Sequence, residues 1–555
     1  MRSRVVAALT TVLLGIALLL AGLVTSGPAL ATGSSTVGPV TVHNLEGTSN
    51  RVIYAVPPPP QVTDMTPAGG PPAIEVTITG SNFGDSRGAS YIQIGDVRTT
   101  EYTSWSSSKI EFLIPEMGFG QFKVSVVTGP PGTAYAGVFA VRHSVWYLAE
   151  GTTAWGFSTY ITMENPNNST VKADITYMTT GGPVPGGTVT MPPTSQATVF
   201  PDLVLKGQDF STRVVCREGE SISVDRTMTW TGPGAASMGA HSSIGVTRPA
   251  KTWYLPEGSS KWGFETWLLI QNPNSRDAAC HVTYMIEGKA PITINRTVPA
   301  NSRRSYNMAA DIGAEDASIK VTSDRMVIPE RAMYRNNRRE GHDSIGATIP
   351  SNYYYLAEGT TSWGFTTYVL IQNPNSYAAD VTITYMTQSG ASPQAPITVP
   401  AQSRKTVRVN DALVNFDVST EVHSNLPIIA ERAMYWNNGT GEAMHDSIGL
   451  WESHPNFYLP DGETGAAETY VLVQNPNAEA IEIDVYYMTP DGKVVSFTDN
   501  VPANSRETYN MADKVPNGRA AVRVFNWAGW KFMAERSMYW NNRGAGACTI
   551  GSYSD

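Results

Sequence analysis

The chain contains many short runs in which hydrophobic and polar side chains alternate. In residues 380–386, Asp-Val-Thr-Ile-Thr-Tyr-Met, the side chains of Val381, Ile383 and Tyr385 fall on one face of an extended strand. Shorter runs of the same kind follow at 397–400, 406–409 and 418–422. Such runs, separated by Gly, Pro and Asn turns, predict about seven strands per unit, which is the strand number of an immunoglobulin-like sandwich.

The run at 380–386 belongs to a stretch that the chain repeats four times. Its landmarks between 355 and 449 are Tyr-Leu-Ala-Glu-Gly, Trp-Gly-Phe, Gln-Asn-Pro-Asn, Thr-Tyr-Met, Glu-Arg-Ala-Met-Tyr and His-Asp-Ser-Ile-Gly, and the same order begins again at Trp146, Trp253 and Phe457. The copies start about 100 residues apart, which is the length of a domain. We therefore predict four β-sandwich repeats: repeat 1 at 143–250, repeat 2 at 251–350, repeat 3 at 351–452 and repeat 4 at 453–555. They resemble modules of secreted bacterial surface proteins of unassigned role.

The N-terminal segment has the pattern of a secretory signal peptide over residues 1–31. Arg2 and Arg4 precede an apolar run, and Ala29-Leu30-Ala31 supplies a small-residue cleavage site. The alternative is an uncleaved anchor helix, because the run is about long enough to cross a bilayer. No second apolar run of that length follows, so we expect no transmembrane segment in the mature chain and a secreted or cell-surface location. A polar linker at 32–59 leads into four consecutive prolines, which favour a stiff, extended spacer.

Residues 60–142 differ in pattern from the repeats. A Pro-x-x-Gly opening at Pro67 is followed by Thr77 to Gly84, an alternating strand that enters a Gly/Asn turn. An Ile-Gly pair at Gly95 and a strand ending in Ile114-Pro115 come next. These features resemble the immunoglobulin-like IPT/TIG domain, which implies a β-sandwich used in surface receptors, adhesins and secreted proteins, without catalytic residues. The predicted fold class is thus all-β, with five tandem immunoglobulin-like β-sandwiches after a signal peptide.

Composition narrows the classes of partner. There are 39 basic against 48 acidic residues, a formal net charge of -9, and no Lys/Arg-rich tract. Nucleic acid and anionic lipid both require a basic face, so we expect neither as a partner. Three cysteines in 555 residues cannot form a disulfide framework. No motif in the sequence calls for a cofactor or a metal.

An arginine interrupts the hydrophobic face of the penultimate strand in every repeat. In repeat 1, Arg226 shares a face with Val224 and Met228. Because a buried guanidinium needs a carboxylate partner, we predict structural ion pairs with the acid of each opening strand rather than a catalytic or ligand-binding role. The predicted pairs are Arg226 with Glu150, Arg331 with Glu257, Arg432 with Glu358, and Arg536 with Asp461.

A tryptophan and a histidine disappear together from repeat 4. The first three repeats contain a Trp-Gly-Phe turn and end in His-x-Ser-Ile-Gly, whereas repeat 4 has Gly465 in the turn and Ala547 at the end. We predict that each indole contacts the imidazole of its own repeat, in the pairs Trp155 with His241, Trp262 with His342, and Trp363 with His445. A zinc or catalytic site would need further ligands that the sequence does not supply.

Two strand ends carry an aromatic residue beside amides, a combination that can stack on sugars. These residues, Trp436 with Asn437 and Trp540 with Asn541, are candidate glycan contacts. The alternative for Trp436 is the core, because it shares a face with Met434 and Arg432. Cys216 and Cys280 have no counterpart in other repeats and are a candidate disulfide between repeats 1 and 2, with two separate buried thiols as the alternative and Cys548 free in both cases.

From these observations we expect a secreted, non-enzymatic structural or adhesive protein of the cell surface or extracellular space. The alternative is a carbohydrate-binding protein that recognises a cell-wall or environmental glycan; a surface protein is another possible partner. A hydrolase is disfavoured because the sequence shows no Ser-His-Asp order and no paired-carboxylate signature.

Overall fold

The computed structural model describes residues 58–129, 132–437 and 442–554, together with the backbone of 37–43 and 49–55. The predicted signal peptide at 1–31 lies outside the described residues. Within the predicted linker at 32–59, strands β1 (Val37–His43) and β2 (Ser49–Ala55) pair antiparallel, so this stretch contains a two-stranded sheet and is not only a spacer.

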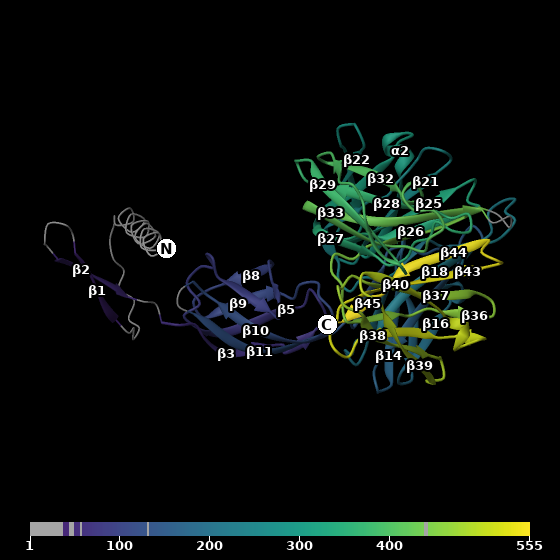
Figure 1. Cartoon of the computed structure of the whole chain (residues 1–555). Helices are drawn as coiled ribbons and strands as arrows, with labels where there is room; N and C mark the ends of the chain where they lie inside the picture. The colour runs from purple at the N-terminus through teal and green to yellow at the C-terminus, as the bar shows by residue number, and fades with distance from the viewer. Residues whose placement is uncertain (1–36, 44–48, 56–57, 130–131, 438–441, 555) are drawn as a thin grey trace.

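The N-terminal sandwich follows this hairpin (Figure 1). One sheet has the order β3-β5-β9-β8 and the other β4-β11-β10-β6-β7. Hydrophobic side chains at alternate strand positions fill the space between the two sheets. Examples are Val76, Ile78, Ile110 and Phe112, which are all fully buried. The strands are β3 (Gln61–Thr66), β4 (Gly69–Gly70), β5 (Glu75–Ser81), β6 (Tyr91–Ile94), β7 (Val97–Arg98), β8 (Tyr102–Trp105), β9 (Lys109–Leu113), β10 (Gly120–Val127) and β11 (Thr133–Val141).

Repeat 1 consists of two four-stranded sheets, ordered β12-β17-β14-β15 and β16-β13-β18-β19. This is eight strands among its described residues, one more than the sequence pattern predicts. They are β12 (Val145–Leu148), β13 (Ser158–Asn165), β14 (Val171–Thr179), β15 (Gly182–Met191), β16 (Ser195–Val199), β17 (Phe210–Cys216), β18 (Ser223–Trp230) and β19 (Gly239–Ile244), with a 3-10 turn η1 (Pro201–Leu203) between β16 and β17.

Repeats 2 to 4 vary this plan. In repeats 2 and 3 one long strand, β25 (Ala317–Arg335) or β33 (Ser419–Asn437), crosses from the first sheet to the second; in repeat 4 the first sheet gains β45 (Ser552–Ser554), and β36 (Glu463–Thr464) and β41 (Gly518–Arg519) form a separate two-stranded sheet. Repeat 2 contains β20 (Ala250–Leu255), β21 (Glu265–Asn272), β22 (Ala278–Ile286), β23 (Ile292–Val298), β24 (Ser302–Asn307), α2 (Met308–Ile312), β25 (Ala317–Arg335) and β26 (Glu340–Ile345). Repeat 3 contains β27 (Ser351–Leu356), β28 (Thr366–Asn373), β29 (Ala379–Thr387), β30 (Gly390–Pro393), β31 (Ile397–Val399), β32 (Ser403–Arg408), η2 (Val409–Asp411), β33 (Ser419–Asn437) and β34 (Glu442–Ile448). Repeat 4 contains β35 (Asn456–Leu459), β36 (Glu463–Thr464), β37 (Glu468–Asn475), β38 (Ile481–Met488), β39 (Val494–Val501), β40 (Ser505–Asn510), η3 (Met511–Asp513), β41 (Gly518–Arg519), β42 (Ala521–Phe525), β43 (Met533–Trp540), β44 (Ala545–Ile550) and β45 (Ser552–Ser554).

The four repeats close into a ring. Their last long strands contact one another in cyclic order: β19 packs on β26, β26 on β34, β34 on β44, and β44 again on β19. Figure 1 shows the repeats gathered into one body, with the N-terminal sandwich beside it. Repeats that are tandem in sequence thus do not form an elongated string in space. The reason is that the penultimate strands are buried on both faces, so each repeat needs a neighbour on either side.

The alternation of β18 shows how both faces are used. Arg226 points toward repeat 2, where its guanidinium lies 2.8 Å from Glu330. The next residues on either side point toward repeat 4: the Asp225 carboxylate lies 3.0 Å from Arg536, and the Thr227 hydroxyl donates to Asp461 at 3.0 Å. The polar face of this strand is thus an interface between repeats and is not exposed to water.

The N-terminal sandwich is attached where the ring closes. Arg248 of repeat 1 pairs with Glu101 at 2.7 Å, and the Thr247 hydroxyl donates to Glu116. On the repeat 4 side, Phe119 packs against Tyr458 with 4.9 Å between ring centroids and forms a backbone bridge with Ser554. One domain therefore holds the first and the last repeat.

The predicted fold class, tandem β-sandwiches in an all-β chain, is confirmed. In the part of the chain that the structure describes, no helix has the length and apolar character needed to cross a membrane.

Candidate binding pockets between the repeats

Each penultimate-strand arginine is fully buried and pairs mainly with acids of the next repeat. Arg226 lies 2.8 Å from Glu330, also pairs with Asp343, and lies 3.3 Å from Glu150 of its own repeat. Arg331 repeats this arrangement with Glu431 at 3.1 Å, Asp446, and Glu257 at 3.6 Å.

The other two arginines differ from the predicted pairing. Arg536 lies 3.7 Å from Asp461 but closer, at 3.0 Å, to Asp225 of repeat 1. Arg432 does not form the predicted pair with Glu358; it pairs with Glu535 of repeat 4 at 2.9 Å, and its Nη2 donates to the Cys548 thiol at 3.0 Å. The physical reason is the ring, because it brings a neighbour's acid closer than the acid of the arginine's own opening strand.

Burial and pairing shift the acid–base behaviour of these groups. Burial opposes the charge on Arg226, yet Asp343 and Glu330 raise its pKa above the ordinary value. Burial also raises the pKa of Glu330 to about 7, against the lowering effect of Arg226. It lowers the pKa of His342 to about 4. Burial thus favours the neutral forms of Glu330 and His342. Against the effect of burial, by contrast, Asp343 and Glu150 raise the pKa of His241, and Arg226 and His241 lower the pKa of Asp343.

Each histidine connects this network to a tyrosine of the next repeat. His241 Nδ1 lies 2.6 Å from Asp343, and its Nε2 lies 3.2 Å from the Tyr334 hydroxyl. That hydroxyl donates to Glu150 at 3.3 Å. The same chain of contacts joins Asp446, His342, Tyr435 and Glu257 at the next interface.

Among the residues that the structure describes, two groups of side chains have donor atoms close enough to share a cation. They are Glu150, His241 and Asp343, and Glu257, His342 and Asp446; in each group the atoms lie within 4.8 Å of one another. Arg226 and Arg331 already supply a positive charge to the same carboxylates. A metal ion would therefore have to displace a guanidinium from each cluster.

The Trp-Gly-Phe turn has a strained backbone in all three repeats that contain it. Trp155 and Gly156 have φ values of 54° and 80°, and the Phe157 amide donates to Ala154 at 3.0 Å, as in a type I′ turn. Trp262 and Trp363 have φ values of 50° and 52°. A bulky residue in this region costs about 1–3 kcal/mol, and such strain is typical of functional sites.

The turn holds the indole at the rim of a pocket rather than in a core. Trp155, Trp262 and Trp363 are 70%, 74% and 64% exposed. The phenylalanine of the turn anchors it instead, because Phe157 stacks on Trp230 with centroids 5.0 Å apart and Phe365 stacks on Trp436 at 4.5 Å.

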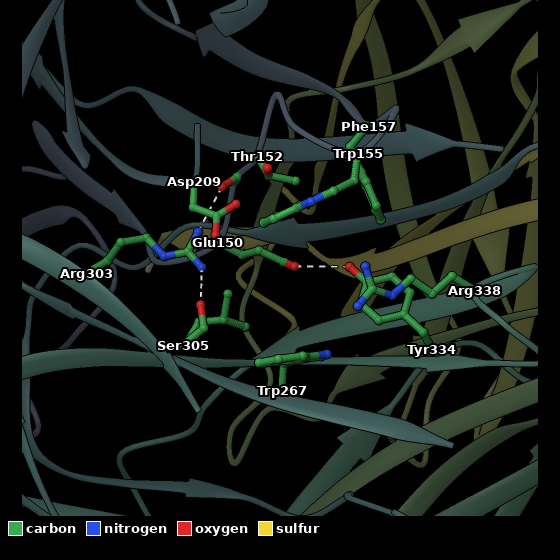
Figure 2. Close-up of a pocket in the computed structure, with 12 residues that line it drawn as sticks. Glu150, Thr152, Trp155, Phe157, Asp209, Trp267, Arg303, Ser305, Tyr334 and Arg338 are labelled. Atoms are coloured by element: carbon green, nitrogen blue, oxygen red, sulfur yellow. Dashed lines mark hydrogen bonds between the residues drawn. The ribbon is translucent and has the colours of Figure 1, made fainter. Parts of the chain in front are cut away.

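The first pocket lies between repeats 1 and 2 and has a volume of about 290 Å³. Figure 2 shows Trp155 and Trp267 on opposite sides of it, with Arg303 at one end and Arg338 at the other. Arg303 comes from repeat 2, and its Nη1 donates to the carbonyls of Gly151 at 2.8 Å and Phe210 at 3.0 Å. Desolvation lowers the pKa of Arg303, and Asp209 and Glu150 partly offset this effect.

Equivalent pockets lie at the next two interfaces. The second, between repeats 2 and 3, has a volume of about 610 Å³, and the third, between repeats 3 and 4, about 90 Å³. Each contains the turn tryptophan, a buried arginine bonded to a backbone carbonyl of the preceding repeat, an aromatic residue opposite, and the acids that correspond to Glu150 and Asp209; Glu287 is a third acid in the second pocket. The second is lined by Trp262, Arg404, Tyr368, Glu257 and Asp316, and the third by Trp363, Arg506, Tyr470, Glu358 and Asp417.

The interface between repeats 4 and 1, which we call the seam, has different residues at these positions. Gly465 replaces the tryptophan, and Gln196, which donates to Pro460 at 3.0 Å, replaces the buried arginine. Arg519 stands at the position of the pocket aspartate, which is Asp209 in the first pocket. It pairs with Asp461 and, at 2.9 Å, with Glu463. The charges of the pocket are therefore reversed at the seam.

The predicted contact between each turn tryptophan and the histidine of its own repeat is wrong for Trp155 with His241, Trp262 with His342, and Trp363 with His445. His241 packs on Trp230 at 5.1 Å and His445 on Trp436 at 5.2 Å, while the turn tryptophans are exposed. The tryptophan lines the pocket, whereas the histidine lies outside the lining and contacts a tyrosine that does line it, as His241 contacts Tyr334; both residue types are absent at the seam.

The predicted glycan contacts at the strand ends separate into buried and exposed residues. Trp436 is buried and its indole N–H donates to the Arg543 carbonyl at 2.6 Å, so the core alternative holds for it. Trp540 packs partly against the core, and Asn541, in a left-handed turn, donates to Ser237 at 3.0 Å. Asn437 is exposed beside Trp436.

The predicted disulfide between Cys216 and Cys280 is not formed. Cys216, Cys280 and Cys548 are all free and buried. Cys216 lies on β17 opposite Ala173, and Cys280 lies on β22 opposite Ser323, so each thiol is enclosed in the sandwich of its own repeat.

Sequence reasoning missed Arg303, Asp209 and Trp267, which build the first pocket. The signal that identifies them is a comparison of the repeats: the positions of Arg303 and Asp209 change to Gln196 and Arg519 at the same interface that lacks the tryptophan.

Comparison with known proteins identifies one part of the chain. Residues 60–141 match the family model of the IPT/TIG domain, as the sequence predicts, and form such a domain. No curated protein matches the chain.

Solved structures resemble parts of the chain at low similarity. Thermotoga maritima protein 1070 is 14% identical over 19% of this chain and 96% of its own, with a TM-score of 0.18. The Anabaena sensory rhodopsin transducer is 28% identical over 15% of this chain and 95% of its own, with a TM-score of 0.13. The SGBP-B protein from a xyloglucan utilization locus of Bacteroides uniformis is 11% identical over 56% of this chain and 80% of its own, with a TM-score of 0.16.

Proposed function

We propose that this protein is a secreted or cell-surface carbohydrate-binding protein whose ring of repeats holds sugar units in the pockets between neighbours. The observation that supports this most directly is the turn tryptophan. In three repeats a strained backbone holds an exposed indole over a polar pocket. Strain that is retained three times at a rim position supports a role in binding rather than in folding.

The chemistry of the first pocket suits a sugar ring. The faces of Trp155 and Trp267 offer apolar surface to the C–H groups of a pyranose, while Glu150, Asp209 and Arg303 offer acceptors and donors to its hydroxyl groups. Pockets with an aromatic lining and a few fixed polar groups are the usual form of small-ligand sites.

Binding without catalysis is part of this proposal. Glu150, the buried acid of the first pocket, is engaged by the Tyr334 hydroxyl at 3.3 Å and by Arg226 at 3.3 Å. A carboxylate held between these two groups serves as a fixed acceptor and not as a proton donor to a glycosidic oxygen.

A structural or adhesive role is the second candidate, and one observation favours it. The N-terminal sandwich contacts repeat 1 through Glu101 and repeat 4 through Phe119. This fixes the ring to the preceding domain and suits a module that displays a rigid head on a stalk. The extracellular location rests on the signal-peptide pattern at 1–31.

A glycan array tests the carbohydrate proposal. We expect the unaltered protein to bind at least one polysaccharide or oligosaccharide class, and a variant with Trp155→Ala, Trp262→Ala and Trp363→Ala to lose most of that signal. Because the three side chains are exposed, the variant should melt close to the unaltered protein.

Trp527→Ala is the matched control. Trp527 is 75% exposed and lies in repeat 4 outside the lining of the three pockets, where its indole N–H donates to Asp484 at 2.6 Å. Its replacement should leave glycan binding unchanged. Failure of the unaltered protein to bind any glycan would refute the proposal and favour the structural role.

A further inference from the structure

The third pocket contains a cation supplied by the protein itself. The Arg543 guanidinium lies 5.5 Å from the ring centre of Trp363, 5.9 Å from that of Tyr470 and 5.6 Å from that of Tyr539. Its Nη2 also lies 3.4 Å from the Tyr470 hydroxyl. Because these aromatic residues line the pocket, the guanidinium fills the space in front of them, and the remaining volume is only about 90 Å³.

The corresponding arginine of the first pocket is placed differently. Arg338 forms a two-pronged pair with Glu265, at 2.8 and 3.1 Å, and approaches Tyr334 at 5.8 Å. The space between Trp155 and Trp267, which we call the aromatic slot, is left open, and the pocket measures about 290 Å³.

The two arginines also differ in how they contact their carboxylate partner. In repeat 4 the acid that corresponds to Glu265 is Glu468. Both acids accept a hydrogen bond from the aromatic residue two positions later, Glu265 from Trp267 at 2.8 Å and Glu468 from Tyr470 at 3.0 Å. The arginine contact is what differs, because Arg338 binds both oxygens of Glu265, whereas Arg543 reaches Glu468 only at 3.5 Å and stacks on the aromatic rings.

The net charges around the two pockets also support a cation-binding slot. In the first, five carboxyl groups face three guanidiniums, an excess of two negative charges when all are ionised. At about pH 6 the excess is one, because Glu330, whose pKa burial raises to about 7, is mostly protonated; protonation of His241 removes one more. The groups are Glu150, Asp209, Glu265, Glu330 and Asp343 against Arg226, Arg303 and Arg338. In the third, four carboxylates face three guanidiniums, namely Glu358, Asp417, Glu468 and Glu535 against Arg432, Arg506 and Arg543. Without Arg543 the third pocket would have the same excess of two when all groups are ionised.

We infer that the aromatic slot of the first pocket accepts a positively charged group, that Arg543 occupies the equivalent space in the third pocket, and that the open slot of the first pocket takes a sugar carrying a free amine. A cation over an aromatic face is attracted by the ring quadrupole, most strongly over tryptophan. The nearby carboxylates provide the compensating charge. This inference rests on the proposed carbohydrate-binding function and names the class of sugar.

Three hexasaccharides with the same β-1,4 linkage test the inference by calorimetric titration. They are the hexamers of glucosamine, N-acetylglucosamine and glucose, used at about pH 6, where free amines are protonated. We expect the glucosamine hexamer to bind about tenfold more tightly than the other two, as one desolvated cation–π contact implies. Arg543→Ala should add one binding site per chain for this hexamer.

Arg408→Ala is the control, because Arg408 is an exposed arginine paired only with Asp411 and outside the three pockets. Equal affinity for the three hexamers would overturn the inference and leave the carbohydrate proposal intact. Tight binding of a neutral glycan without any binding of the glucosamine hexamer would also overturn the inference and leave the carbohydrate proposal intact. Binding of hexalysine as tight as that of the glucosamine hexamer would show that the slot recognises cations without requiring a sugar. Absence of binding to every glycan would overturn both proposals, and an unchanged number of sites in Arg543→Ala would refute the assignment of Arg543 as the occupant.

Discussion

The seam and the three pocketed interfaces solve the same packing problem with different residues. At the pocketed interfaces a buried arginine faces a glutamate and either an aspartate or a thiol of the next repeat, with a histidine and a tyrosine beside it. At the seam Arg536 faces only Asp225 and Asp461, and Arg519 supplies a second positive charge. The three interfaces with a pocket thus share a set of residues around the buried arginine. The seam, which lacks the pocket, retains the buried arginine and its acids without the histidine and the tyrosine. The difference separates the residues that close the ring from those that build a pocket.

The largest expected effect comes from removing a central arginine. Arg331→Leu leaves Glu431, Asp446 and Glu257 buried without their counter-charge and should lower the free energy of unfolding by about 3–5 kcal/mol. Arg536→Leu should cost less, because Arg519 remains beside Asp461. Calorimetric melting of both variants measures the difference, and an equal loss would show that the seam is not electrostatically distinct.

Next in size is the dependence of stability on pH. The pKa of Glu330 is raised by burial to about 7 in the folded protein from an ordinary value of 4.5, so the folded state binds more protons than the unfolded chain between these values. Stability should therefore rise as the pH falls from about 8 to about 6.5. The range stops there because His342, with its pKa lowered to about 4, has the opposite effect below its ordinary value of 6.5.

Glu330→Gln should reduce this slope, since it removes a titrating group. Melting temperatures of both proteins across the same pH range provide the measurement. A melting temperature that falls on acidification from about pH 8 would contradict the assigned direction.

A smaller effect is expected from the tyrosine of the pocketed interfaces. Tyr435→Phe removes a hydroxyl that donates to Glu257 at 2.9 Å and lies 3.3 Å from His342. It should cost about 1–3 kcal/mol, because it leaves a buried acceptor unsatisfied. At the seam the corresponding residue is Thr229, and Thr229→Val should stay within about 0.5 kcal/mol. Urea unfolding compares the two, and similar costs would remove this distinction between the interfaces.

The smallest effect concerns the thiols. Because Cys216 and Cys280 are free and buried in separate repeats, a reducing agent should leave the melting temperature unchanged. Peptide mapping without reduction should recover both as unlinked, alkylated peptides once the protein is unfolded. A linked pair of peptides would contradict this arrangement.

Strand alternation predicted the sandwiches and the burial of the arginines, because both depend on local periodicity. It did not reveal the partner of Arg432, since alternation assigns a side chain to a face and not to a neighbouring repeat. The joint loss of the turn tryptophan and the histidine from repeat 4 suggested a contact between them that does not exist, because joint loss marks residues of one interface and not neighbours. Arg303 and Asp209 come from strands of different repeats, so only a comparison of equivalent interfaces could identify them.

A linear array of repeats has two ends that must be capped with polar surface, whereas here every repeat has a neighbour on both sides. The last strand lies beside repeat 1, because the hydroxyls of Ser552 and Ser223 are 2.7 Å apart. The ring is thus circular in topology even though the chain is linear. A circular permutant would join residue 554 to residue 143 and open the connection between repeats 2 and 3. Such a permutant would keep the inter-repeat contacts of the ring, so these contacts do not depend on which repeat comes first in the chain.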